Sequence, residues 1–119
     1  MVKDFIRRLK EKYIENQVNN TEIPKFSDSE IVNKNFKFSG KVQGVGFRFQ
    51  FMLMAQELEL VGWVKNLSDG RVEAEVQGPR NKIEFLVDSM KNKPIIRINN
   101  IEEKEQALNN KLKEFKAVY

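Results

Sequence analysis

Hydrophobic and polar positions follow two different periods along the chain, and the two periods predict alternating strands and helices from residue 36 onward. Strands are indicated where apolar residues alternate with polar ones, and helices where they recur every three or four positions. The clearest helical stripe has apolar residues at i, i+3, i+4 and i+7: Ile83, Leu86, Val87 and Met90. The predicted elements are a strand at 36–43, a helix at 47–61, strands at 63–67 and 72–77 around a hairpin turn, a helix between Pro79 and Pro94, a strand near 96–101 and a short closing strand at 115–119.

The order of these elements predicts the fold class. Strand, helix, strand, strand, helix, strand (βαββαβ) is the pattern of an α+β, ferredoxin-like α/β sandwich. We therefore expect one antiparallel sheet with two helices on one face. This architecture supports enzymes, nucleic-acid binders and metal carriers, so the function has to be argued from a site.

Residues 1–35 differ from the rest of the chain and are predicted to form an N-terminal extension before a domain at 36–119. Apolar residues recur at helical spacing near the start, which predicts an amphipathic helix over 1–15, followed by a polar linker. Such a helix can dock on a membrane surface or a partner, or it can pack on its own domain or on a second copy. We expect a monomer, with a dimer through this extension as the alternative.

Two residue types are missing from the composition, and this narrows the chemistry. The chain has no Cys and no His. Disulfides, cysteine nucleophiles, Ser-His-Asp triads and histidine-built zinc sites are therefore excluded. An enzyme with this sequence has to work with Arg, Lys, Asn, Gln, Ser, carboxylates and backbone amides.

The formal net charge of +4 favours anionic partners, such as a phosphorylated metabolite, nucleic acid or an acidic membrane. Basic and acidic residues are interspersed, however, which is typical of a solvated mixed surface. No apolar run reaches the roughly 20 residues of a spanning helix. A cytoplasmic location without a membrane span is the expectation.

The segment from Gly40 to Arg48 (GKVQGVGFR) runs from the first strand through a glycine-rich turn into a helix. Gly44 and Gly46 allow a tight turn and a close approach to a ligand. Free amides at the start of a helix form an anion site, and Arg48 adds a planar fork that can hold two phosphate oxygens. The residues alone leave a second interpretation open, in which the glycines only make a turn and Arg48 is solvated.

A second segment, from Gly62 to Val72 (GWVKNLSDGRV), contains Asn66 just before the predicted hairpin turn. Asn is common near turns, so Asn66 by itself does not indicate catalysis.

Together the two segments resemble the two signature motifs of the acylphosphatase family, and the resemblance covers roughly residues 36–119. The family hydrolyses the carboxyl-phosphate bond of acyl phosphates, giving a carboxylate and inorganic phosphate, without a metal or cofactor. The resemblance implies that Arg48 binds the substrate phosphate and that Asn66 orients the attacking water. It also implies a phosphate cradle, formed by Gln43, Gly44, Val45, Gly46, Phe47 and Arg48.

The residue chemistry agrees with this assignment, because phosphoryl transfer needs mainly positioning and charge stabilisation. A carboxylate leaves without being protonated, so a site that lacks His and Cys is sufficient. With no base in either motif, a phosphate oxygen of the substrate is the expected acceptor of the water's proton.

Two alternatives remain. One is a nucleic-acid-binding module, although no RNP-type aromatic motif is present on the predicted central strands. The other is a domain that binds phosphate without hydrolysing a substrate. The expected partners are acyl phosphate and inorganic phosphate, with no nucleic acid.

Overall fold

The computed structural model describes residues 23–119, so the helix predicted over 1–15 lies outside the described part of the chain. Within 23–119, neither helix has the length and apolar composition that a membrane crossing requires. The elements follow the predicted order: β1 (Ile31–Lys41), α2 (Phe47–Glu57), β2 (Val61–Asn66), β3 (Val72–Pro79), α3 (Arg80–Lys91), β4 (Arg97–Gln106) and β5 (Phe115–Val118).

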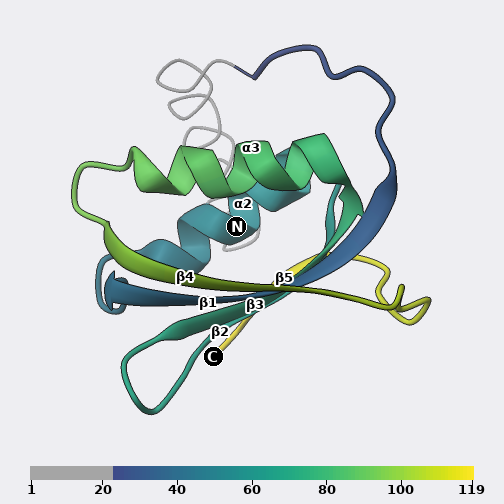
Figure 1. The fold of residues 1–119 in the computed structure, drawn as a ribbon. Helices are drawn as coiled ribbons and strands as arrows, with labels where there is room; N and C mark the ends of the chain where they lie inside the picture. Colours follow the sequence, from purple (N-terminus) through teal and green to yellow (C-terminus); the bar gives the residue numbers. More distant parts are fainter. Residues whose placement is uncertain (1–22) are drawn as a thin grey trace, which may run out of the picture.

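The strands form one five-stranded sheet in the order β4-β1-β3-β2-β5. This arrangement confirms the ferredoxin-like α+β class, with α2 and α3 on the same face of the sheet (Figure 1). One pairing corrects the expectation of a purely antiparallel sheet: β5 runs parallel to β2, with Gly62 opposite Phe115 and Val64 opposite Ala117. The reason is that β4 lies at one edge and β5 at the other. The chain therefore crosses the end of the sheet before β5 and enters it in the direction of β2.

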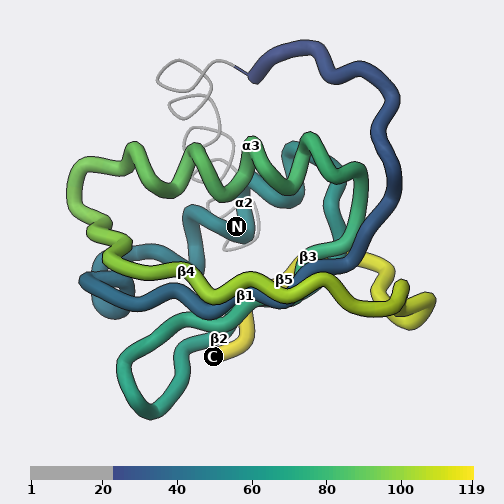
Figure 2. The backbone as a smooth tube through the Cα atoms, viewed as in Figure 1, coloured from purple at the N-terminus to yellow at the C-terminus, as the bar shows by residue number. Residues whose placement is uncertain are grey.

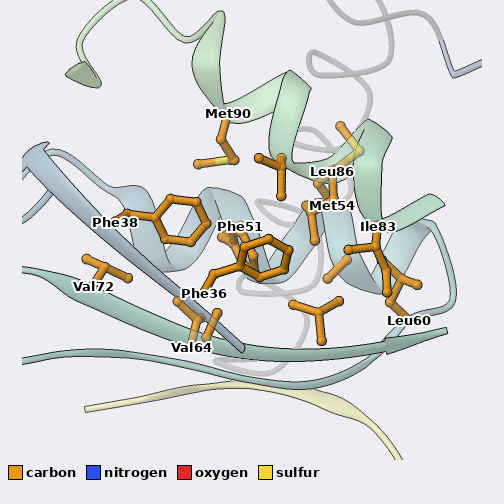
Figure 3. Close-up of a cluster of buried hydrophobic side chains, with 14 of the residues drawn as sticks. Phe36, Phe38, Phe51, Met54, Leu60, Val64, Val72, Ile83, Leu86 and Met90 are labelled. Atoms are coloured by element: carbon orange, nitrogen blue, oxygen red, sulfur yellow. The ribbon is translucent and has the colours of Figure 1, made fainter. Parts of the chain in front are cut away.

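The core lies between the sheet and the two helices (Figure 3). Alternation along the strands sends Phe36 and Phe38 of β1 into this layer, where α2 contributes Phe51 and α3 contributes Ile83 and Leu86. All five side chains are at most 1% exposed. Burial of this apolar surface provides the main stabilisation of the fold.

The first strand begins earlier than predicted, at Ile31 instead of residue 36. The polar residue Asn33 hides this part of the strand in the sequence, because it is fully buried on the face away from the helices. Its side-chain amide donates to the Glu75 carboxylate over 2.8 Å. The division into an extension at 1–35 and a domain at 36–119 remains a prediction, and a truncation that tests it has to retain β1 from Ile31 onward.

The helix predicted over 47–61 is also shorter, because α2 ends at Glu57. Glu59 adopts a left-handed conformation (φ 60°), which stops the helix and turns the chain into β2. The apolar residues Leu58 and Leu60 belong to this turn and are both 2% exposed. Their burial gave the sequence a helix-like run beyond the true end of α2.

Candidate active site

The loop between β1 and α2 presents the start of a helix to solvent. Gly44 has φ 73° and Gly46 has φ 79°, a left-handed region that favours glycine. Gly46 is the N-cap of α2, and within the described chain no side chain caps it and no acidic residue occupies the first turn. The first amides of α2 are therefore available to an anion, with the helix dipole adding to the attraction.

Phe47 fixes this helix start to the core. Its side chain is 1% exposed, and its ring centroid lies 5.1 Å from that of Phe38 and 5.6 Å from that of Phe51. Because the ring points into the core, Phe47 can contribute to an anion site through its backbone amide, and Phe38 and Phe51 hold that amide in place.

Arg48, the second residue of α2, is held by the end of the chain. Its Nη1 donates to the main-chain carbonyl of Val118 over 3.1 Å. Its guanidinium carbon lies 4.1 Å from the centroid of the Tyr119 ring, which is the geometry of a cation–π contact. Figure 2 shows the C-terminal segment beside β2, where β5 pairs with it. One face and one donor of Arg48 are thus used for orientation, and its other donors remain for a ligand.

Asn66 is the last residue of β2, opposite Val72 of β3. Its Oδ1 is buried and accepts no hydrogen bond from any of the described residues. Gln56 Oε1 and Asn81 Oδ1 share this property, but neither residue lines the pocket that Asn66 lines. A buried oxygen without a hydrogen bond lowers the stability of the fold. On a residue that lines a pocket, such an oxygen points to a donor supplied by a ligand or by water.

An open pocket of about 130 Å³ brings these groups together. It is lined by Val42, Gly44, Gly46, Phe47, Arg48, Phe49, Asn66 and Tyr119. The two predicted catalytic residues, Arg48 and Asn66, therefore share one pocket with both loop glycines. Among the described residues that line the pocket, Arg48 has the one charged side chain. Within residues 23–119 no group of three carboxylates lies close enough to hold a metal ion.

Gln43 and Val45, which were predicted to belong to the phosphate cradle, are not among the lining residues. The side chain of Gln43 instead donates to two main-chain carbonyls of the β2–β3 hairpin, that of Leu67 over 2.7 Å and that of Arg71 over 2.9 Å. Gln43 thus connects the loop before α2 to the hairpin that follows Asn66.

The hairpin is closed by hydrogen bonds of its own. The amide of Leu67 donates to the carbonyl of Arg71 over 2.8 Å. The amide and the Nε of Arg71 donate to the two carboxylate oxygens of Asp69 over 3.1 and 2.9 Å. The hydrogen bond from the backbone amide of Arg71 is the main cause that holds the pKa of the Asp69 carboxyl below its ordinary value. Asp69 therefore stays ionised at neutral pH and supports the turn beside Asn66.

Three residues of the pocket, Val42, Phe49 and Tyr119, were missed by the sequence analysis. Val42 is a buried residue directly after β1, and only its place beside the loop brings it to the pocket. Phe49 lies in the apolar run of α2, where it is indistinguishable from a core residue until the helix is oriented. Tyr119 reaches the pocket because β5 pairs in parallel with β2, and nothing in the local sequence around Tyr119 indicates that pairing.

The sequence is similar to those of known acylphosphatases. The family model described as Acylphosphatase matches residues 34–117. An acylphosphatase of Koribacter versatilis is 40% identical over 84 residues, which cover 70% of this chain and 76% of that relative. An acylphosphatase of Acaryochloris marina is 54% identical over 56 residues, which cover 47% of this chain and 60% of the relative's length.

The fold is also similar to that of a solved acylphosphatase structure. The crystal structure of acylphosphatase from Bacillus subtilis superimposes with a TM-score of 0.69 at 36% sequence identity, covering 74% of this chain and 99% of that one. The match to the family model, over residues 34–117, spans most of the described sheet and both helices. It includes the loop that carries Arg48 and the strand that ends at Asn66. The chain belongs to the acylphosphatase family.

Proposed function

We propose that this protein is an acylphosphatase, which hydrolyses the carboxyl-phosphate bond of acyl phosphates. One observation carries the proposal: Arg48 and Asn66 line the same pocket, next to the start of α2. The side chain of Arg48 is cationic, and the buried Oδ1 of Asn66 has no hydrogen-bond partner among the described residues. This set offers a place for a phosphate and, separately, a hydrogen-bond acceptor that can orient a water molecule.

The substrate phosphate binds at the loop in this mechanism. Amides of the first turn of α2 donate to its oxygens, with the glycines at 44 and 46 leaving the backbone open to the ligand. Arg48 donates to the same phosphate with the N–H groups that Val118 does not use. A cluster of donors set before the reaction stabilises the charge that develops on the phosphoryl oxygens.

Asn66 positions the nucleophile. Its Oδ1 accepts a hydrogen bond from a water molecule and thereby aims the water's oxygen at the phosphorus. The water's oxygen forms the new P–O bond while the bond between phosphorus and the acyl oxygen breaks, and the carboxylate leaves with the electron pair. The water's proton passes to a phosphate oxygen, so the products are the carboxylate and inorganic phosphate.

We further propose that the reaction needs neither metal nor cofactor, and that the protein acts in the cytoplasm as a monomer on a small acyl phosphate. The leaving carboxylate needs no Lewis acid or general acid, and the pocket already contains a permanent cation in Arg48. Sedimentation of the full chain measures the oligomeric state, and a dimer would contradict the monomer and direct attention to residues 1–35.

The experiment is phosphate release from benzoyl phosphate by the full chain in the presence of excess chelator. Arg48→Ala and Asn66→Ala are compared with wild type and with two matched variants outside the pocket, Arg97→Ala and Asn99→Ala, both at exposed positions of β4. Circular dichroism verifies that each variant is folded.

We expect chelator-resistant turnover by wild type and by both β4 variants. Misplacement of a reacting group by about 1 Å costs on the order of 10²-fold in rate, which is the loss in kcat expected when Asn66→Ala no longer positions the water. Arg48→Ala should in addition weaken inhibition by inorganic phosphate. A folded wild type that binds phosphate without turnover would contradict the enzyme and favour a phosphate-binding domain.

A further inference from the structure

Two aromatic side chains line the pocket without a role in the mechanism above. Phe49 is 41% exposed and Tyr119 is 81% exposed, so both rings present apolar surface to solvent at the opening of the site. A single exposed aromatic residue is ordinary on a protein surface. Two that share a pocket with the proposed phosphate and water sites have the composition of a ligand subsite, in which apolar walls surround a few polar anchors.

The position of Tyr119 relative to Arg48 relates this apolar surface to the substrate. The guanidinium of Arg48 lies 4.1 Å from the ring centroid of Tyr119. A phosphate held by Arg48 is therefore close to the Tyr119 ring, and so is the group bonded to that phosphate. Phe49 follows Arg48 directly on α2 and lines the same pocket.

The remaining lining residues leave few other surfaces for the acyl group. The glycines and the start of α2 are assigned to the phosphate, and Asn66 to the water. Val42 and Phe47 are each 1% exposed and offer almost no side-chain surface. In-line displacement puts the leaving oxygen opposite the attacking water, so the acyl group points away from the water at Asn66. The lining residues with apolar surface left for it are Phe49 and Tyr119.

We propose that Phe49 and Tyr119 form an acyl-binding subsite that selects acyl phosphates with an aromatic or bulky apolar acyl group over acetyl phosphate. The inference rests on the proposed function and specifies its substrate class. Arg48 is assigned to the phosphate, and among the other lining residues within 23–119 no charged side chain is left to recognise an ionic acyl group. Apolar contact in a pocket discriminates between substrates by roughly 10- to 200-fold for a small change in size.

The first test compares kcat/KM for benzoyl phosphate and acetyl phosphate in the full-length wild type, Phe49→Ala and Phe49→Leu. The two leaving groups differ in intrinsic reactivity, and this difference cancels when the ratio of the two constants is compared between variants. We expect the benzoyl-to-acetyl ratio to fall roughly tenfold in Phe49→Ala and less in Phe49→Leu, which retains apolar surface. Phe85→Ala, at a half-buried aromatic position on α3, is the matched control and should leave the ratio unchanged.

Tyr119→Ala removes two proposed contributions of Tyr119, which are the orientation of Arg48 and the contact with the acyl group. Because this ring also orients Arg48, both constants should fall, with that for benzoyl phosphate falling further. An unchanged ratio in both Phe49→Ala and Tyr119→Ala would overturn the subsite.

A binding measurement keeps the test independent of turnover. Methylphosphonate and benzylphosphonate present the same phosphonate group with different substituents, and their affinities for the full chain can be measured by calorimetry. Tighter binding of benzylphosphonate, with the preference reduced in Phe49→Ala, supports the subsite even if no acyl phosphate is hydrolysed. Equal affinities overturn it, whereas absence of turnover by itself contradicts only the proposed function.

Discussion

The side-chain amide of Gln43 donates a hydrogen bond to the main-chain carbonyl of Leu67 over 2.7 Å, which ties the loop before α2 to the residue that follows Asn66. The same amide donates to the carbonyl of Arg71 over 2.9 Å and so bridges both ends of the hairpin loop. We therefore expect the side chain of Gln43 to act on Asn66 through the backbone, as a positioning group.

Replacement of Gln43 with Met keeps the length of the side chain and removes both hydrogen bonds. A hydrogen bond contributes about 1 kcal/mol on average, so we expect kcat to fall roughly tenfold as Asn66 loses its fixed position. The inhibition constant of inorganic phosphate should change by less than about twofold, since the phosphate donors are untouched. Steady-state kinetics with benzoyl phosphate and phosphate as inhibitor measure both quantities.

Gln56→Met is the matched control, because Gln56 also donates from its side chain to a backbone carbonyl, that of Phe115 over 2.9 Å, away from the pocket. It should lower stability without the selective loss of kcat. The double variant Gln43→Met with Asn66→Ala should be no slower than Asn66→Ala alone, since the two residues act as one unit. Weaker phosphate binding with unchanged kcat would instead identify Gln43 as a phosphate ligand.

Arg48→Lys conserves the charge but not the geometry of the site. A Lys ammonium has no planar fork, so it cannot stack on Tyr119, donate to Val118 and hold a phosphate with two parallel bonds at once. We expect inhibition by inorganic phosphate to weaken roughly tenfold or more. The same change at Arg97, exposed on β4, should have no effect. Retention of wild-type phosphate inhibition in Arg48→Lys would show that charge alone is sufficient.

Asp69 should titrate below the ordinary range of an Asp carboxyl, because Arg71 donates to it from its backbone amide and its side chain. A lowered pKa in the folded state means that the ionised carboxylate stabilises the hairpin above the ordinary pKa, and that this contribution is lost as the pH falls through the folded pKa. Carboxyl NMR titration should give a midpoint for Asp69 below the ordinary value of an Asp carboxyl. In Arg71→Ala the Asp69 midpoint should rise but not reach the ordinary value, because the backbone amide at position 71 remains. An ordinary midpoint for Asp69 in wild type would contradict this effect of Arg71.

The sequence predicts the elements that bury one face, because the period of apolar residues is a direct consequence of that burial. The stripe at Ile83, Leu86 and Met90 belongs to α3, and each of these side chains is fully buried. Prediction is weaker where polar residues are inside or apolar ones outside. Asn33 is buried in a polar network with Glu75 on the far face of the sheet, so the first five residues of β1 did not look like a strand.

Some parts of the candidate site could likewise be predicted from the sequence, and others could not. Arg48 and Asn66 were identified from their motifs, and both line the pocket together with Gly44 and Gly46. The side-chain bonds of Gln43 could not be predicted, because they depend on the loop before α2 and the hairpin meeting in space. The arrival of Tyr119 likewise depends on a pairing between strands that are distant in sequence.

Phe47 offers a test of how the core supports the phosphate site. Its ring is buried against Phe38 and Phe51, whereas its backbone belongs to the pocket. Phe47→Ala should lower the free energy of unfolding by about 3–5 kcal/mol, and Phe47→Leu by less, because Leu refills part of the cavity. Urea unfolding of both variants measures this loss.

If the Phe47 ring acts only by fixing the backbone, phosphate should still stabilise Phe47→Leu nearly as much as it stabilises wild type. The stabilisation by a ligand depends only on its concentration and its dissociation constant for the folded state. Repeating the urea titrations at a fixed phosphate concentration therefore reports the affinity of each folded variant separately from its stability. A Phe47→Leu protein that loses little stability but no longer responds to phosphate would mean that the aromatic ring itself sets the geometry of the amides, and that the core and the phosphate site are more tightly coupled than backbone anchoring alone requires.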